Sequence, residues 1–176
     1  MRECSTLRAL NEHHTLVNAT MKPLQLTTPS ETEIRLERSF DAPLSSVWQA
    51  YTESQIVQRW LTGPPGYSMP ECEIDFRPGG RWRYLWLTDQ GEMEAYGTFR
   101  EIIERQKIVY TETFAEWPDY EALGTASFTE AEGLTTIVVN IAYGSQQARD
   151  AVIDSHVEYG MEMSYSNLDE LLAEGK

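Results

Sequence analysis

The chain has 176 residues, of which 41% are hydrophobic, so it is long enough for one domain with its own core. The formal net charge of −14 at pH 7 opposes binding to phosphate backbones, so nucleic acid is not an expected partner. No run approaches roughly 18 apolar residues, and the first twenty residues lack an apolar core. The sequence therefore predicts neither a membrane span nor a secretion signal. Cys4 and Cys72 have no pairing pattern, which indicates reduced thiols in a cytoplasmic protein.

Residues 1–30 are expected to be a tail or arm, and residues 31–176 the folded domain. The first segment has few aromatic residues, and Pro23, Pro29 and Ser30 precede the first strand. Two interpretations of the tail stay open. Translation starts at Met21 in one, whereas in the other the segment is an arm that docks on a second subunit of a homodimer.

Apolar residues alternate with charged ones where the first strand is predicted, at Ile34, Leu36 and Phe40. Asp41 can cap a helix and Pro43 suits a first turn, so a short helix is expected next. A second small helix is expected at Glu53–Leu61. The sequence from Gly63 to Gly66 reads as a loop.

A run of strands follows, with short connections that favour antiparallel neighbours. The predicted strands are Tyr67–Phe76, Arg81–Leu87, Glu92–Ile103, Lys107–Phe114, Ala122–Thr129 and Thr135–Tyr143. Strict alternation places Trp82, Tyr84 and Trp86 on one face of their strand. Ala115–Glu121 is too irregular for a strand and reads as a loop at the rim of the sheet.

The last segment, Gln146–Ala173, has no proline and predicts one continuous helix. Its apolar stripe consists of Ile153, Val157, Met161, Ser164, Leu168, Leu171 and Leu172. A long amphipathic helix and a sheet with one apolar face bury both surfaces most simply by packing together. The predicted class is therefore α+β, with a single domain.

This order of elements, together with several local motifs, resembles the SRPBCC or START-like superfamily. The branch is the one similar to the activator of heat-shock-protein-90 ATPase. The motifs are FDAPLSSVWQAYT (Phe40–Thr52), WLTGPPG from Trp60, EIDFRPGGRWRY (Glu73–Tyr84), YGTFREI (Tyr96–Ile102) and KIVYTETF (Lys107–Phe114). With the final helix, the resemblance covers about Glu31 to Glu174.

The resemblance implies a helix-grip fold of the START or Bet v 1 type. A curved antiparallel sheet of six or seven strands would enclose a long C-terminal helix, with two small helices after the first strand. Relatives bind lipids, steroids, polyketide-like or other hydrophobic molecules between sheet and helix, and a minority catalyse reactions on them. Close relatives carry a glycine and a tryptophan where this chain has His156 and Met161. The identity of a ligand therefore does not carry over.

The candidate ligand-binding residues follow from this arrangement. They are Trp60, Trp82, Tyr84, Trp86, Tyr110, Glu112, Phe114, Tyr120, His156, Gly160 and Met161. The aromatic residues either form plain core or line a cavity, with Trp60 and Tyr120 expected at its mouth. Glu112 is a polar anchor if it points inward with Tyr110 and Phe114, or it points outward through a bulge.

Two helix residues have alternative interpretations as well. His156 either donates to a ligand or acts as a general base, or it is a hydrogen-bonded residue at the edge of the stripe. Gly160 costs helix stability, and close approach of a strand or ligand would explain it.

We assign no catalytic residue, metal ligand or cofactor, because the sequence has no paired cysteines, no His-x-x-x-His and no glycine-rich phosphate loop. The predicted function is binding of a small hydrophobic molecule (lipid-, polyketide- or aromatic-like) in the cavity. Two alternatives remain: a cavity enzyme of the cyclase, dehydratase or hydrolase type, and a co-chaperone-like module that binds a protein partner. Non-enzymatic binding is favoured among the three.

Overall fold

The computed structural model describes residues 23–175, which form eight strands and four helices. The elements in chain order are β1 (Gln25–Ser30), β2 (Glu33–Phe40), α1 (Leu44–Thr52), α2 (Ser54–Trp60), β3 (Ser68–Ile74), β4 (Arg81–Thr88), β5 (Gly91–Ile103), β6 (Lys107–Phe114), β7 (Ala122–Ala131), β8 (Leu134–Ala142), α3 (Gln146–Asp154) and α4 (Val157–Glu174). The predicted α+β helix-grip architecture is confirmed, with one strand more than the expected six or seven.

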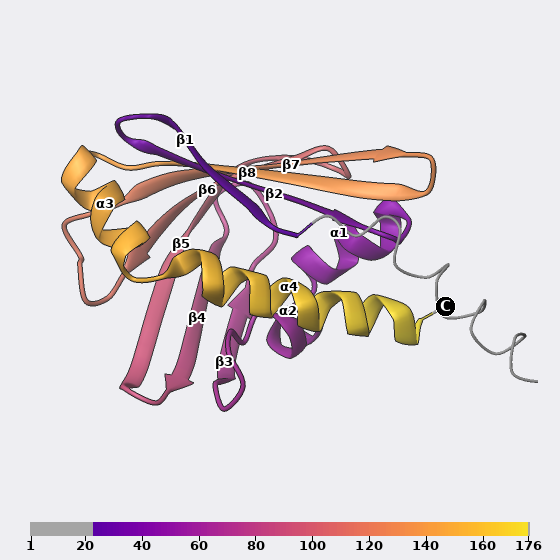
Figure 1. The fold of residues 1–176 in the computed structure, drawn as a ribbon, viewed down its shortest axis with the longest axis horizontal. Coiled ribbons are helices and arrows are strands. Elements are labelled where there is room, and N and C mark those ends of the chain that lie inside the picture. The colour runs from indigo at the N-terminus through magenta and orange to yellow at the C-terminus, as the bar shows by residue number, and fades with distance from the viewer. Residues whose placement is uncertain (1–22, 176) are drawn as a thin grey trace, which may run out of the picture.

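All eight strands belong to one antiparallel sheet, in the order β1-β2-β8-β7-β6-β5-β4-β3. In the described sheet, β2 and β8 are the only neighbouring strands that do not follow each other along the chain. Figure 1 shows that α4 runs along the concave side of the sheet, whereas β3, β4 and β5 cross it steeply. The sheet therefore wraps around the helix.

The additional strand, β1, lies inside the segment that was expected to be a tail. It pairs with β2 in the register Leu26↔Leu36. Just before it, the backbone N–H of Leu24 donates to Glu162 Oε2 on α4 (2.8 Å), and the Leu24 side chain is buried. Residues 23–30 thus pack on the domain, while the expectations for residues 1–22 lie outside the described part of the chain.

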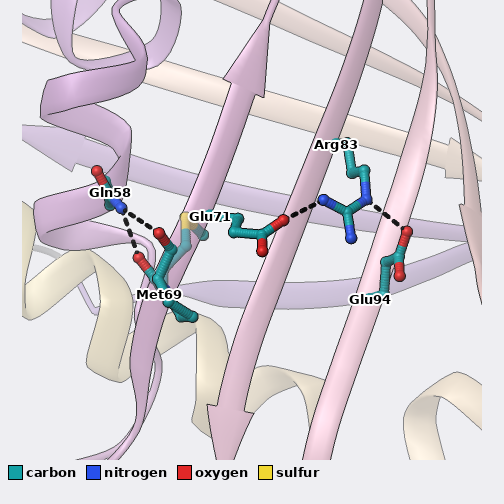
Figure 2. Close-up of polar contacts among 6 residues, drawn as sticks. Gln58, Met69, Glu71, Arg83 and Glu94 are labelled. Carbon is teal, nitrogen blue, oxygen red and sulfur yellow. Dashed lines mark hydrogen bonds and ion pairs between the residues drawn. The ribbon is translucent and has the colours of Figure 1, made fainter.

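The two small helices cover one end of the sheet, as expected. Pro43 occupies the N-cap position of α1, so Asp41, the residue that suits capping, lies outside the helix. Trp48 on α1 packs edge-on against Phe128 of β7, with ring centroids 5.1 Å apart. On α2, Gln58 donates to the backbone carbonyls of Met69 and Pro70 at 2.8 and 3.0 Å, which ties the helix to β3 (Figure 2).

The prediction of one continuous C-terminal helix is wrong. Helix α3 ends at Asp154 and α4 begins at Val157, because His156 adopts a left-handed conformation with φ 62°. The N–H of His156 donates to the carbonyl of Ile153 (3.0 Å), and Ser155 Oγ donates to that of Val152 (2.7 Å), so local bonds satisfy the end of α3. His156 lies exposed in this junction rather than on an apolar stripe.

The two faces of β4 differ as the alternation predicts. Trp82, Tyr84 and Trp86 face the helix side, and Arg83 lies on the opposite face. Arg83 binds Glu71 on β3 and Glu94 on β5, the latter at 2.7 Å, which links three strands by charge (Figure 2). The inward side of the sheet is therefore the aromatic one.

Small residues on β5 and β7 make room for large side chains on their neighbours. A Cβ added to Gly97 would lie 1.7 Å from the carbonyl oxygen of Thr111 and 2.7 Å from Trp82 Nε1. A Cβ added to Gly124 would lie 2.3 Å from Tyr110 Cζ. By contrast, a Cβ added to Gly160 meets nothing within 4 Å. The close approach of a strand expected at Gly160 is thus wrong, because the space beside it is open, whereas approach of a ligand there stays a prediction.

These glycines give a paired test. Gly97→Ala should lower the free energy of unfolding by about 1–3 kcal/mol, because the new methyl group overlaps the backbone of β6. Gly160→Ala should raise it by up to about 1 kcal/mol, because alanine favours the helix and finds free space. Urea unfolding of both variants measures the two changes, and a Gly97→Ala protein as stable as the parent would contradict the close packing.

Candidate ligand-binding site

Three aromatic side chains follow one another along the inward face of β4. The rings of Trp82 and Tyr84 have centroids 4.7 Å apart, and those of Tyr84 and Trp86 are 5.8 Å apart. Trp86 donates from its indole nitrogen to the carbonyl of Leu61 (2.6 Å), which fixes its ring. Trp82 has a buried indole N–H that no acceptor from residues 23–175 satisfies. Tyr84 remains only partly buried.

On β6 the inward residues are Tyr110, Glu112 and Phe114. Tyr110 pairs with Gly124 of β7, Glu112 with Ala122, and Phe114 with Ala95 of β5. Directly opposite residues of an antiparallel pair share a face, and Ala95 and Ala122 are buried. The Tyr110 ring meets Trp82 edge-on at 6.1 Å. Glu112 therefore points inward, among small and aromatic side chains, and the alternative of an outward turn through a bulge is wrong.

Glu112 is the unusual group of this face. Protein surrounds the carboxyl, and this burial raises its pKa from 4.5 to about 7. Within the described chain Glu112 forms no hydrogen bond and no ion pair, although its side chain is not sealed from solvent. With its pKa raised toward neutrality, the carboxyl is in part protonated near pH 7, and in that form it can donate a hydrogen bond as well as accept one.

A group of tyrosines surrounds this carboxyl. Burial raises the pKa of Tyr84, Tyr110 and Tyr143, and the nearby charge of Glu112 raises each of them further. Deeper in the fold, Tyr51 donates from its hydroxyl to that of Tyr165 (2.9 Å). The nearby phenols of Tyr110 and Tyr84 also raise the pKa of Tyr51. The inner space thus combines apolar rings with several hydroxyl groups and one carboxyl.

Sequence reasoning did not single out Tyr51, Tyr143 or Tyr165 for the site. Tyr143 continues the alternation of the inward residues Ile137, Val139 and Ile141 on β8, so the period-two pattern could have identified it. Tyr165 follows Met161 by four positions and was reachable from the helical period. No comparable signal marks Tyr51, because its role depends on how α1 packs.

Not every predicted residue lies in this group. Trp60, expected at the mouth, is core: it is 2% exposed, stacks on Tyr165 at 5.9 Å and donates to the carbonyl of Ala50. Tyr120 is 51% exposed in the loop between β6 and β7. His156 is exposed at the junction between α3 and α4, whereas Met161 packs against the core from α4.

A separate polar cleft of about 410 Å³ lies beside the N-terminal end of the described chain. It is lined by Pro23, Arg38, Glu162, Ser166, Asp169 and Glu170. Arg38 binds Asp169 there, with Nη2 and Oδ2 2.5 Å apart. Burial raises the pKa of Asp169 to about 6, against the opposing effect of Arg38. None of the sequence-predicted site residues lines this cleft.

Residues 23–175 contain no group of three or more His, Cys, Asp and Glu side chains placed to hold a metal ion. None of the helices in this part of the chain has the length and apolarity that crossing a membrane requires.

Comparison with known proteins identifies the family. The sequence profile of the Activator of Hsp90 ATPase homolog 1-like proteins matches residues 41–173, which include the elements from α1 to α3 and all of α4 except its last residue. The chain belongs to this family. The predicted resemblance is confirmed, and the SRPBCC-like helix-grip assignment with it. A comparison with curated proteins gave no match.

Solved structures show the same fold. A protein of Rhodobacter sphaeroides is 27% identical, with a TM-score of 0.79, and the match covers 87% of this chain and 99% of that one. A protein of Mycobacterium smegmatis is 23% identical, with a TM-score of 0.78, covering 89% of this family member and 100% of the other chain. A third, from Nitrosomonas europaea, is 18% identical with a TM-score of 0.74, covering 84% and 98%.

The buried carboxyl generates a prediction about stability and pH. Because folding raises the pKa of Glu112, its stabilising contribution is present below about pH 4.5 and is lost as pH rises through about 7. Glu112→Gln stays neutral. It should match the parent near pH 5 and be more stable near pH 8, by on the order of 3 kcal/mol at most.

Urea unfolding at both pH values measures this difference. The matched control is Glu73→Gln, which removes an exposed carboxylate from β3 and should show no such pH-dependent gain. A constant difference between Glu112→Gln and the parent across this range would contradict the burial of the carboxyl.

Proposed function

We propose that this protein binds a small, mostly apolar molecule in a cavity between the inward face of the sheet and α4. One observation carries the proposal. The inward face of the sheet carries Tyr84, Tyr110 and Glu112. Protein surrounds these three side chains, yet each of them is only partly buried. Partial accessibility at that depth supports an internal space that reaches them.

The composition of the surrounding side chains supports the same function. Trp82, Trp86 and Phe114 supply apolar surface, and the hydroxyls of Tyr84, Tyr110 and Tyr143 form no hydrogen bond within the described chain. Ligand sites combine a mainly apolar wall with a few convergent polar groups that orient the molecule. The rings of Trp82 and Tyr110 lie close above Gly97 and Gly124, so these glycines bring the aromatic wall near the sheet.

A second candidate function is an enzyme in the same cavity, of the cyclase, dehydratase or hydrolase type. It is favoured by Glu112, because a carboxyl with its pKa raised to about 7 is matched to general acid or base work near neutral pH. The phenols around it could hold a polar group of a substrate. Native mass spectrometry of protein from its own host separates the two: a bound molecule that stays unchanged supports binding alone.

Met161 gives the test of the binding proposal. It packs from α4 against the core and is only partly buried. Met161→Trp should fill part of the proposed cavity, and should weaken binding of the neutral fluorescent probe N-phenyl-1-naphthylamine by roughly tenfold. Fluorescence titration measures the dissociation constant.

The matched control is Tyr159→Trp, which changes an exposed residue two positions earlier on the same helix and should leave probe binding unchanged. Circular dichroism establishes that both variants keep the fold. If Met161→Trp binds the probe as tightly as the parent protein does, the proposed cavity does not lie beside Met161.

A further inference from the structure

Glu112 is an acidic group without a positively charged partner among the described residues. No arginine, lysine or histidine among the described residues contributes to the pKa of Glu112, which burial alone shifts. The inward-facing guanidinium of Arg38 binds Asp169, and that of Arg83 binds Glu71 and Glu94 on the outer face. The described residues thus supply no positive charge that would stabilise an ionised Glu112.

The side chains around Glu112 are rings rather than amides or cations. Tyr110 and Phe114 flank it on β6, and the rings of Trp82 and Tyr84 lie on the same face of β4, where Trp82 meets Tyr110 edge-on at 6.1 Å. An aromatic face attracts a cation within about 6 Å of its centroid, most strongly where water is excluded. An unpaired carboxylate with several aromatic faces is an environment that selects a positively charged organic group.

The net charge of the whole protein also favours a positively charged ligand. With a formal net charge of −14 at pH 7, the protein attracts cations and repels anions over its surface. An anionic ligand would meet both this field and Glu112. A purely apolar ligand would leave the carboxyl and the phenols unsatisfied, at a cost in free energy.

We propose that the polar end of the ligand is a cationic amine or ammonium group, held by Glu112 and the surrounding aromatic rings. The ligand class is then an amphiphilic organic cation whose apolar part lies along the inward face of the sheet. This inference rests on the proposed function, since it names the class of molecule that the same cavity takes.

The groups that face Glu112 decide how binding depends on pH. They are Tyr84 from β4, Tyr110 from β6 and Tyr143 after β8, with Cys72 of β3, Tyr51 of α1 and Tyr165 of α4 beyond them. Burial raises the pKa of Cys72 to about 11 and that of Tyr165 to about 12, and the other phenols are raised as well. Between pH 6 and 8, Glu112 is therefore the group in this set that changes charge.

Asp169, with its pKa raised to about 6, titrates nearby but faces Arg38 in the separate cleft. A substitution at Glu112 distinguishes the two carboxyl groups, because it leaves the contact between Arg38 and Asp169 in place.

The experiment compares two probes of nearly equal shape. Benzyltrimethylammonium has a permanent charge and no titrating proton, and neopentylbenzene is its neutral isostere. Each competes with N-phenyl-1-naphthylamine on the full chain between pH 6 and 8. The cation should bind more tightly as pH rises and Glu112 ionises, whereas the neutral isostere should not gain affinity.

Two variants complete the test. Glu112→Gln should bind the cation at least roughly tenfold more weakly at pH 8 and should abolish the pH dependence. Glu73→Gln alters the net charge equally but on the outer face, so it should behave like the parent. Urea unfolding at pH 8 establishes that both variants are folded.

Each contrary outcome has a separate meaning. If N-phenyl-1-naphthylamine does not bind the parent protein, the proposed function fails and the inference fails with it. If it binds, but the cation shows no advantage over its isostere or none that depends on Glu112, only the inference is overturned. Tighter binding of the neutral isostere at low pH would show that a protonated Glu112 favours neutral ligands. That result would overturn the inference as well.

Discussion

Tyr165 joins three separate parts of the fold at one side chain. It is 1% exposed on α4, meets Phe40 at the end of β2 edge-on at 5.5 Å, and stacks with Trp60 of α2 at 5.9 Å. Its hydroxyl, which would be costly to bury alone, accepts a hydrogen bond from Tyr51 of α1. The position of α4 beneath the sheet depends on this contact, and every residue of the candidate site is placed relative to α4 and the sheet.

The site itself opposes the stability of the fold. An ionised carboxyl is buried only when something offsets its lost hydration, and no described residue offers Glu112 an opposite charge. The contrast with Asp169 is informative, because this carboxyl has an arginine partner in Arg38, although burial still raises its pKa. Arg38 and Asp169 are thus paired within the protein, whereas the described residues leave Glu112 without an ionic partner.

The sequence predicted the sheet well because its physical signal is local. Alternation along β6 places Tyr110 and Glu112 on one face of that strand, but only the pairing of the strands shows that this face is the inward one, shared with Tyr84. The signal failed at β1, where exposed polar residues give no alternation and pairing with β2 creates the strand. It also failed at His156, because the apolar periodicity continues on both sides of a single left-handed residue. Tyr51 could not be found, since its place depends on the packing between α1 and α4.

The two edges of the sheet share a feature that affects behaviour at high concentration. β1 contains Pro29 and β3 contains Pro70, and the pairing register of each edge strand shifts near its proline. Proline has no N–H to offer a neighbouring chain, and an irregular edge presents no continuous row of donors and acceptors. An open eight-stranded sheet would otherwise be a template for strands of other molecules. Both edges of the described sheet are thus poor templates for the growth of intermolecular sheets.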